Sequence, residues 1–189
     1  YGARMKVSMI LAVDQNGLIG CSNNTLPWSD KEDMAWFKKN TLDKAVLMGK
    51  NTWLSIGKPL PKRSNFVLSK TEVMDPIWFT VTVDSFNKAI NLAKYFGRDE
   101  LVIIGGKQVY ESLVHKVDRI ILTVIPGEHE GDVFVDIPII DLLRCHVPLF
   151  SDLETALEQF PLWDIVHNEV SESTGNHYII IERKEQRTY

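Results

Sequence analysis

One acidic residue lies among apolar and aromatic neighbours in the segment Leu26-Pro27-Trp28-Ser29-Asp30-Lys31-Glu32-Asp33-Met34-Ala35-Trp36-Phe37. The spacing predicts a helix that begins near Ser29 and carries Asp33 and Phe37 one turn apart on its apolar side. A carboxylate on that side needs a partner, and burial tends to raise its pKa. Asp33 is therefore a candidate for binding and polarising a ligand. The alternative is an acid that is solvated or paired with a structural Arg or Lys.

The other residues of this predicted helix sort by side. Met34 and Trp36 flank the acid on the apolar side. The charged residues fall toward the opposite side: Lys31, Glu32, Lys38 and Lys39. The helix is thus expected to be amphipathic, with Asp33 as its exception.

Two predicted strand-to-helix junctions contain glycine: Gly49-Lys50-Asn51-Thr52 and Gly105-Gly106-Lys107-Gln108. Glycine lets a backbone approach a ligand closely, and the start of a helix offers unpaired N–H groups to an anion. The alternative is a tight turn that needs glycine for a positive φ. Two such junctions suggest a ligand with phosphates at more than one place. The second junction does not match GxGxxG, which excludes a Rossmann assignment.

Cationic side chains stand near the same predicted strands. Lys70 follows a strand that ends at Leu68-Ser69, and ligands of open α/β sheets bind at that edge. Arg63 follows a proline-stiffened loop at residues 57–62, and its guanidinium suits a carboxylate held by two hydrogen bonds. Taken singly, each cation has a simpler interpretation, as a solvated surface charge or the cap of a turn.

Short β-branched runs alternate with helical patterns, which is typical of an α/β domain with a largely parallel sheet. Strands are predicted at residues 7–13, 45–48, 65–68, 79–83, 101–104 and 119–124. Helices are predicted at residues 30–39, from 51, after 85 as far as 97, and from 107 to about 114. A capping box at residues 151–154 predicts one more helix, which Pro161 ends. Residues 162–170 and 177–182 predict an antiparallel hairpin around a turn-rich connection.

Composition narrows the function classes. The 189 residues, 44% hydrophobic and 24% charged, fit one soluble domain with a substantial core. The net charge of −4 gives no support for a nucleic-acid or anionic-membrane partner. No apolar run approaches the roughly 20 residues that span a bilayer. The scattered cysteines and histidines give no metal-ligand spacing, and free thiols are expected. Met5 is the expected natural start, with residues 1–4 an artificial addition.

Together these segments resemble dihydrofolate reductase, over residues 5 to about 136 and again in the final hairpin. The order and spacing of the shared motifs carry the resemblance: Ala12-Val13-Asp14, Leu18-Ile19-Gly20, Leu26-Pro27-Trp28, Asp33 with Trp36-Phe37-Lys38, Met48-Gly49-Lys50 with Thr52-Trp53, Ser55-Ile56-Gly57, Pro59-Leu60-Pro61 with Arg63, Ile104-Gly105-Gly106 with Tyr110, Thr123 and Glu130-Gly131-Asp132. The resemblance implies a single α/β domain over residues 5–189. Its mostly parallel central sheet would be flanked by helices and would end in an antiparallel hairpin.

The resemblance implies a substrate site for dihydrofolate. Asp33 would hydrogen-bond the pterin, with Thr123 supporting the same network, and the carbonyls of Ile10 and Ile104 would complete the polar edge. Arg63 would grip the α-carboxylate of the glutamate tail. The other implied substrate contacts are Leu11, Met34, Phe37, Ile56 and Tyr110. Leu26 and Trp28 would join Asp33 and Thr123 in the catalytic centre.

The same resemblance implies NADPH as the cofactor. Ala12 and Ile19 would hold the nicotinamide carboxamide through backbone groups. Thr52 and the Gly105-Gly106 junction, which is a cis peptide in the family, would cradle the pyrophosphate. The 2′-phosphate would meet Lys50, Ser69 and Lys70. The remaining implied contacts are Gly20, Gly49, Asn51, Thr71, Ile104, Lys107, Gln108, Val109 and Tyr110.

The implied reaction passes a hydride from the nicotinamide to C6 of dihydrofolate, and N5 gains a proton by way of water. The product, tetrahydrofolate, supports one-carbon metabolism and nucleotide synthesis. Asp33 would polarise the pterin, while the protein supplies stacking geometry and electrostatics. Residues 20–28 would form a lid over the nicotinamide, with Asp132 as its anchor.

Three features depart from the family pattern. The lid, Cys21-Ser22-Asn23-Asn24-Thr25, is one residue longer than in compact bacterial members. Gln108 stands where many bacterial members carry an Arg, so the preference for NADPH is expected to survive in weaker form. Residues 139–161 form an insertion, which we interpret as a structural elaboration rather than a surface for a partner.

Two other functions remain as hypotheses. The pyrimidine reductase of riboflavin synthesis shares the fold and the cofactor but has no reason to keep Asp33 or Arg63. A folate- or nucleotide-binding module without catalysis is the second. The presence of Thr52 and Thr123 beside those two residues favours the reductase. The expected partners are dihydrofolate and antifolate inhibitors, with no nucleic acid and no membrane, and the protein is expected to be a cytoplasmic monomer.

Overall fold

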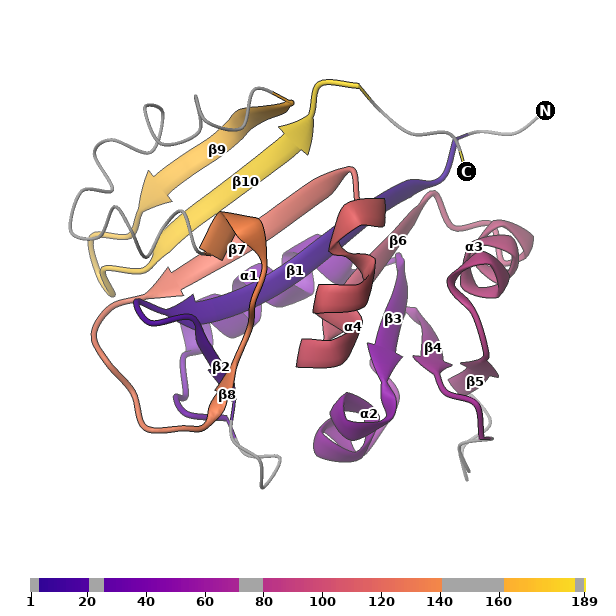
Figure 1. Cartoon of the computed structure of the whole chain (residues 1–189), viewed down its shortest axis with the longest axis horizontal. Helices are drawn as coiled ribbons and strands as arrows, with labels where there is room; N and C mark the ends of the chain where they lie inside the picture. Colours follow the sequence, from indigo (N-terminus) through magenta and orange to yellow (C-terminus); the bar gives the residue numbers. More distant parts are fainter. Residues whose placement is uncertain (1–3, 21–25, 72–79, 141–161, 186–188) are drawn as a thin grey trace.

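The computed structural model describes residues 4–20, 26–71, 80–140, 162–185 and 189 of the chain. Within these ranges, ten strands alternate with four α-helices and one short 3₁₀ helix (Figure 1). Their bounds are β1 (Lys6–Asp14), β2 (Leu18–Gly20), α1 (Lys31–Thr41), β3 (Ala45–Gly49), α2 (Lys50–Ile56), β4 (Ser64–Leu68), β5 (Thr80–Val83), α3 (Phe86–Tyr95), β6 (Glu100–Gly105), α4 (Lys107–Leu113), η1 (Val114–Lys116), β7 (Arg119–Ile125), β8 (Val133–Phe134), β9 (Trp163–Val170) and β10 (His177–Arg183).

Eight of the described strands form one sheet, in the order β5-β4-β3-β6-β1-β7-β10-β9. The six strands from β5 to β7 are parallel to their neighbours, whereas β10 and β9 are antiparallel. The remaining two described strands, β2 and β8, pair with each other. The largely parallel sheet and the antiparallel final hairpin were both predicted from the sequence and are confirmed.

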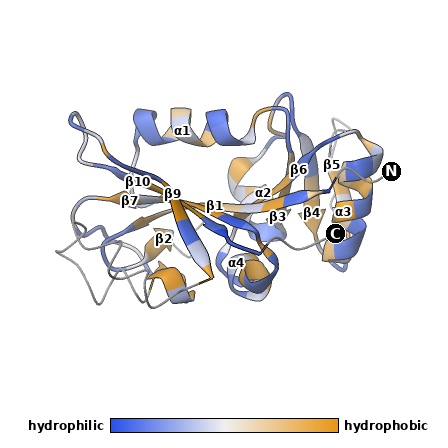
Figure 2. Ribbon diagram, turned by 90° about the horizontal axis from the view of Figure 1, so that it is seen from above, coloured by the Kyte–Doolittle hydropathy of each residue, from blue (hydrophilic) through white to orange (hydrophobic). Residues whose placement is uncertain are grey.

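The central strand β1 serves two cores. Val7, Met9 and Leu11 belong to the larger apolar cluster, and Ile10 belongs to the smaller one on the other face. Successive side chains of a strand point to opposite faces, so a continuous apolar run suits a strand that is covered on both sides. Helices α3 and α4 cover the larger cluster, and α1 and α2 lie over the smaller one (Figure 2).

The sequence missed three short elements, β2, β8 and η1. Each has only two or three residues. An alternation of apolar and polar residues needs about four residues or more to be recognised. The helix predicted after the capping box at residues 151–154, and most of the insertion at residues 139–161, lie outside the described residues.

The start of α1 differs from the prediction by a short distance. The N-cap is Asp30, the residue after Ser29, and its carboxylate accepts a hydrogen bond of 3.0 Å from the Asp33 backbone N–H. A short acidic side chain is among the best N-caps, because it satisfies an amide that has no partner within the helix. The apolar side is also less buried than expected. Met34 is 67% exposed, and Thr41 is the fully buried residue of the helix.

Candidate active site

The ladder between β1 and β6 ends before the strands do. Its last paired residues are Met9 and Ile103, so the carboxyl ends of the two strands are no longer paired beyond them. The carbonyl of Ile10 instead accepts a hydrogen bond of 2.7 Å from the buried hydroxyl of Tyr110 in α4. After β1, the next strand of this sheet is β3, which lies on one side of this point. After β6, the next strand is β7, which lies on the other side. Ligands of open α/β sheets bind at such a switch point.

Asp33 lies at this position on the smaller-cluster face. The Thr123 hydroxyl, on β7, donates a hydrogen bond to its carboxylate. Burial raises the pKa of Asp33 above its usual range, the Thr123 hydrogen bond opposes part of that rise, and the charges of Asp30 and Glu32 add to it. No Lys, Arg or His in the described part of the chain forms an ion pair with Asp33. The structural ion pair that was the alternative for Asp33 is therefore not seen among these residues.

Tyr110 is the second polar group of this region. Burial and the nearby charge of Asp33 raise its pKa above the usual range, so the hydroxyl stays protonated and donates to Ile10. A carbonyl oxygen has two lone pairs, which leaves Ile10 able to accept another hydrogen bond. Ala12 is the partner of Thr123 across the β1–β7 ladder, so it lies one strand away from the hydroxyl that contacts Asp33.

Apolar side chains gather on the face of the sheet that α1 covers. Ile10 and Ile104 are buried in the smaller cluster, and Phe37 and Ile56 pack against it from α1 and α2. Leu11 points to the other face and is buried in the larger cluster. The structure thus brings four of the predicted substrate contacts into one cluster and leaves Leu11 on the opposite side of the sheet.

Arg63 is fixed against the end of α1. Its Nη1 donates to the Thr41 hydroxyl and its Nε to the Pro61 carbonyl, both at 2.9 Å. The Thr41 hydroxyl in turn donates to the Phe37 carbonyl at 2.8 Å. These contacts orient the guanidinium beside the apolar cluster, and Nη2 makes no hydrogen bond with any residue that the structure describes.

The two glycine junctions lie side by side. Met48 is the ladder partner of Gly105, and the Gly105–Gly106 peptide bond is cis. A Cβ on Gly106 would lie 3.3 Å from the Thr52 hydroxyl, and one on Gly49 would lie 3.0 Å from a methyl group of Val109. Gly105 also has a φ of 123°, as the alternative of a tight turn requires. The close packing and the unusual φ together require glycine here.

Cations and hydroxyls line the ends of the neighbouring elements. Ser69, Lys70 and Thr71 follow β4, and the Ser69 hydroxyl accepts the Thr71 backbone N–H at 3.2 Å. Lys50 and Lys70 are exposed and form no ion pair within the described ranges. Three further predicted contacts are also exposed: Asn51, Lys107 and Gln108.

The predicted lid residues are only partly described. Ile19 is half-buried, and Gly131 approaches Gly20 so closely that a Cβ on it would lie 2.7 Å from the Gly20 carbonyl oxygen. Leu26 is 72% exposed, and the Trp28 ring packs edge-on against His129 at 5.3 Å. No hydrogen bond, ion pair or ring contact in the described part of the chain joins either residue to Asp33. Residues 21–25 lie outside the described residues.

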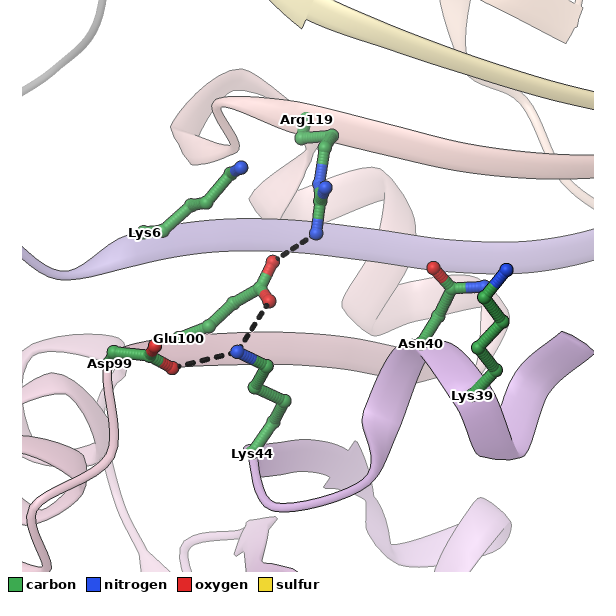
Figure 3. Close-up of a pocket in the computed structure, with 7 residues that line it drawn as sticks. All are labelled: Lys6, Lys39, Asn40, Lys44, Asp99, Glu100 and Arg119. Carbon is green, nitrogen blue, oxygen red and sulfur yellow. Dashed lines mark hydrogen bonds and ion pairs between the residues drawn. The ribbon is translucent and has the colours of Figure 1, made fainter. Parts of the chain in front are cut away.

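A hollow lies at the opposite end of the sheet, where the parallel strands begin (Figure 3). It has a volume of about 300 Å³ and holds the carboxylate of Glu100 between Arg119 and Lys44. Every charged side chain drawn there except Lys39 takes part in an ion pair. These charges neutralise one another, so the hollow is better explained as structure than as a ligand site.

A carboxylate beside a hydroxyl, on the sheet face that carries the smaller apolar cluster and with two glycine junctions in the same sheet, is the arrangement expected of an enzyme that brings a polar heterocycle beside a phosphorylated cofactor. The dihydrofolate reductase family model matches residues 6–143. Dihydrofolate reductase from Haemophilus influenzae is 42% identical over 132 residues, which are 69% of this chain and 78% of the relative. The Bacillus subtilis enzyme is 40% identical over 126 residues, 67% of this chain and 73% of the relative. The chain therefore belongs to the dihydrofolate reductase family.

The fold comparison agrees with this assignment. The structure of dihydrofolate reductase from Enterococcus faecalis, complexed with NADP(H) and RAB-propyl, matches with a TM-score of 0.73 and 24% sequence identity. The match covers 95% of this chain and 97% of the other. The similarity therefore extends over nearly the whole of both chains.

Sequence analysis missed several contacts of α1. Glu32, which helical spacing assigns to the solvent side, accepts hydrogen bonds from the turn between β9 and β10 and from β10 itself. The Trp36 ring packs against Tyr178 at 4.7 Å and His167 at 5.4 Å. The one available signal was the run of hydroxyl side chains at residues 171–174, which marks a turn rich in donors.

Proposed function

We propose that the protein reduces 7,8-dihydrofolate to 5,6,7,8-tetrahydrofolate with NADPH. The observation that carries the proposal is Asp33, a partly buried carboxyl group whose described partner is the Thr123 hydroxyl and which lacks a described cationic partner. A carboxylate left without a cation retains its capacity to bind a nitrogen-rich ring. Family membership supports the same reaction.

Asp33 accepts hydrogen bonds from the amino group and a ring nitrogen of the pterin, and Thr123 keeps its carboxylate in place. The negative charge then draws positive charge onto the pterin and raises the affinity of N5 for a proton, which arrives by water. The raised pKa of Asp33 supports this role, because a carboxyl group with more proton affinity shares a proton more readily with its ligand.

The walls of the cluster fix the substrate. Phe37 and Ile56 stack against the rings, and Met34, which is 67% exposed, covers them from the first turns of α1. The carbonyls of Ile10 and Ile104 complete the polar edge. Arg63, already oriented by Thr41 and Pro61, binds the α-carboxylate of the glutamate tail.

The residues at the glycine junctions fit a phosphorylated cofactor. The junctions combine the side-chain-free backbones of Gly49, Gly105 and Gly106 with the Thr52 hydroxyl, which suits a pyrophosphate, and Lys50 and Lys70 supply charge for a 2′-phosphate. Bound NADPH supplies the hydride that C6 of the substrate receives. The further contacts assigned to it are Ala12, Ile19, Gly20, Asn51, Ser69, Thr71, Lys107, Gln108, Val109 and Tyr110. We further propose that the protein works as a monomer.

The test is the loss of NADPH absorbance with dihydrofolate, for the wild type and Arg63→Met. We expect rapid wild-type turnover that an antifolate inhibits competitively. Arg63→Met should raise the KM for dihydrofolate about 10-fold or more, because a charge-assisted pair is lost. Turnover of a pterin without the glutamate tail should not change.

Lys58→Met, an exposed cation of the same loop, is the matched control and should behave as the wild type. A wild type that binds folate but does not oxidise NADPH would contradict the proposed reaction and leave a binding module. Oxidation with an aminopyrimidine of riboflavin synthesis, and none with dihydrofolate, would also contradict it.

A further inference from the structure

The first turn of α1 is held by the final hairpin rather than by the core. The one fully buried residue of the helix, Thr41, lies at its other end, where Arg63 also contacts it. Asp33 belongs to the first turn, so core packing alone leaves the position of its carboxyl group loosely determined.

Glu32, the neighbour of Asp33, is bound by four hydroxyl groups of the hairpin. The Oγ of Ser171 and the Oγ1 of Thr174 donate to its carboxylate at 2.6 Å each, and the Tyr178 hydroxyl donates at 2.7 Å. The Ser173 hydroxyl adds a longer bond of 3.2 Å. Asn176 extends the contact to the N-cap, because its Nδ2 donates to Asp30 at 2.6 Å. We call this set of contacts the Glu32 latch.

The hairpin is rigid enough to act as a support. Within its turn, the Ser171 backbone N–H donates to the Asn176 carbonyl at 2.8 Å, and the Gly175 N–H to the Ser171 carbonyl at 2.9 Å. Tyr178 is the direct ladder partner of Thr123 across β10 and β7. Two neighbouring residues of α1 are therefore held by two neighbouring strands, Asp33 by Thr123 and Glu32 by Tyr178.

We propose that Glu32 is a positioning residue for the reaction: the Glu32 latch fixes the first turn of α1 over β7 and β10 and thereby holds Asp33 against Thr123. The effect of the latch on the reaction rests on the proposed function, whereas its effect on the position of the first turn of α1 does not. Charge is a second consequence of the same contacts. The hydrogen bonds from Ser171, Thr174 and Tyr178 lower the pKa of Glu32 to about 2, so it remains an anion at any neutral or mildly acidic pH.

The electrostatic surroundings of Asp33 are set by few groups. Asp30 and Glu32 approach it from α1, Tyr110 from α4 and Tyr178 from β10. Both tyrosines are neutral, because their pKa values are raised. Glu32 is thus an anion next to Asp33, and the latch keeps that charge at a fixed distance.

The first experiment is hydrogen exchange on the ligand-free protein, which needs no assumption about the reaction. In Glu32→Ala, the Met34 amide, which donates to Asp30 in the first turn, should exchange about 10-fold faster than in the wild type. The Leu42 amide, at the other end of the helix, should not change and serves as the internal reference. Glu172→Ala, an exposed acid in the same turn, is the matched control.

The second experiment measures kcat and KM for dihydrofolate in the same variants. Glu32→Ala should lower kcat/KM about 10-fold, because a small displacement of a positioned group has a large effect on rate. Glu32→Gln, which keeps an acceptor oxygen, should restore part of the loss. A double variant, Ser171→Ala with Thr174→Ala, retains the charge, loosens the turn and should reproduce the defect.

The outcomes separate the two proposals. Unchanged Met34 exchange and unchanged kcat/KM in Glu32→Ala, relative to Glu172→Ala, would overturn the positioning role even if the wild type is an active reductase. If kcat/KM falls while Met34 exchange stays as in the wild type, the effect is one of charge and positioning is overturned. If Glu32→Ala does not fold, the double variant decides by the same two measurements. A wild type without turnover would contradict the proposed function, and exchange would still test the latch.

Discussion

Two carboxylates, at opposite ends of the sheet, have opposite surroundings. Glu100, where β6 begins, is 3% exposed and accepts hydrogen bonds from Arg119 at 2.5 Å and from Ser8 at 2.6 Å, with Lys44 at 3.6 Å. Asp33, near the carboxyl ends of the strands, accepts one from Thr123 and lies beside two other acids. The first charge is neutralised by its neighbours, and the second is not.

The difference separates structure from function. A buried acid with matched cations is satisfied within the fold and has no capacity left for a ligand. An acid that the fold leaves under-neutralised raises the free energy of the ligand-free protein, and a ligand that donates to it lowers that free energy. The following changes test this comparison, from the largest expected effect to the smallest.

The largest effect is expected from Asp33→Asn. The amide keeps the shape but cannot supply the negative charge that polarises the pterin, so kcat/KM at neutral pH should fall about 100-fold or more. The loss should become smaller as the pH falls, because a substrate that is already protonated needs less help. Steady-state kinetics across pH would measure this, and a loss that does not depend on pH would contradict the assigned role.

Glu100→Ala should act on stability instead. Removing the acid takes the nearer ion-pair partner from the partly buried Arg119, which keeps a longer pair with Glu182 at 3.9 Å, and the free energy of unfolding should fall by about 3 kcal/mol. The kcat of the folded fraction should stay near that of the wild type. Asp99→Asn is the control, because its pair with Lys44 is exposed and is worth about 0–1 kcal/mol. Denaturant titration of both variants would measure the difference. Equal losses of unfolding free energy in Glu100→Ala and Asp99→Asn would contradict the assignment of Glu100 as a structural acid.

Lys70→Ala tests the cofactor end of the site. Loss of a cation from the proposed 2′-phosphate contact should raise the KM for NADPH about 10-fold. The KM for NADH, which lacks that phosphate, should stay the same. Lys88→Ala, a surface lysine of α3, should leave both constants as in the wild type. A parallel rise for both cofactors would exclude the assigned contact.

The smallest expected effect is a gain of stability in Asp33→Asn. Because the pKa of Asp33 is higher in the folded than in the unfolded protein, the folded state binds the proton more tightly and loses stability as the pH rises through that pKa. The neutral amide avoids this loss. The variant should therefore have a higher Tm than the wild type at neutral pH, and the difference should vanish in acid. A variant that is less stable at neutral pH would argue against an under-neutralised carboxylate.

The sequence allowed much of this fold to be predicted, for a physical reason. Buried parallel strands such as residues 45–48 and 101–104 are continuous apolar runs, and Ser85 marks the start of α3 as its N-cap. Asp33 was singled out because a carboxylate breaks the apolar side of a short helix. Each of these signals is local, so one segment is enough to reveal it.

The contacts that the sequence did not reveal depend on distant segments. Glu32 meets Ser171 across 139 residues, and only the assembled sheet brings the hairpin to α1. Helical spacing correctly separates Glu32 from the apolar side but cannot say what covers the other side. The exposure of Met34 has a related cause, because α1 is buried at Thr41 and less so toward its first turn.

The most direct test is an NMR titration of the Asp33 side-chain carboxyl group in the ligand-free protein, assigned with Asp33→Asn. We predict a pKa above the ordinary range of an aspartic acid, as burial next to Asp30 and Glu32 requires. A pKa at or below that range would mean that the fold neutralises Asp33 as fully as a structural acid. That result would contradict its role as the group that polarises the substrate.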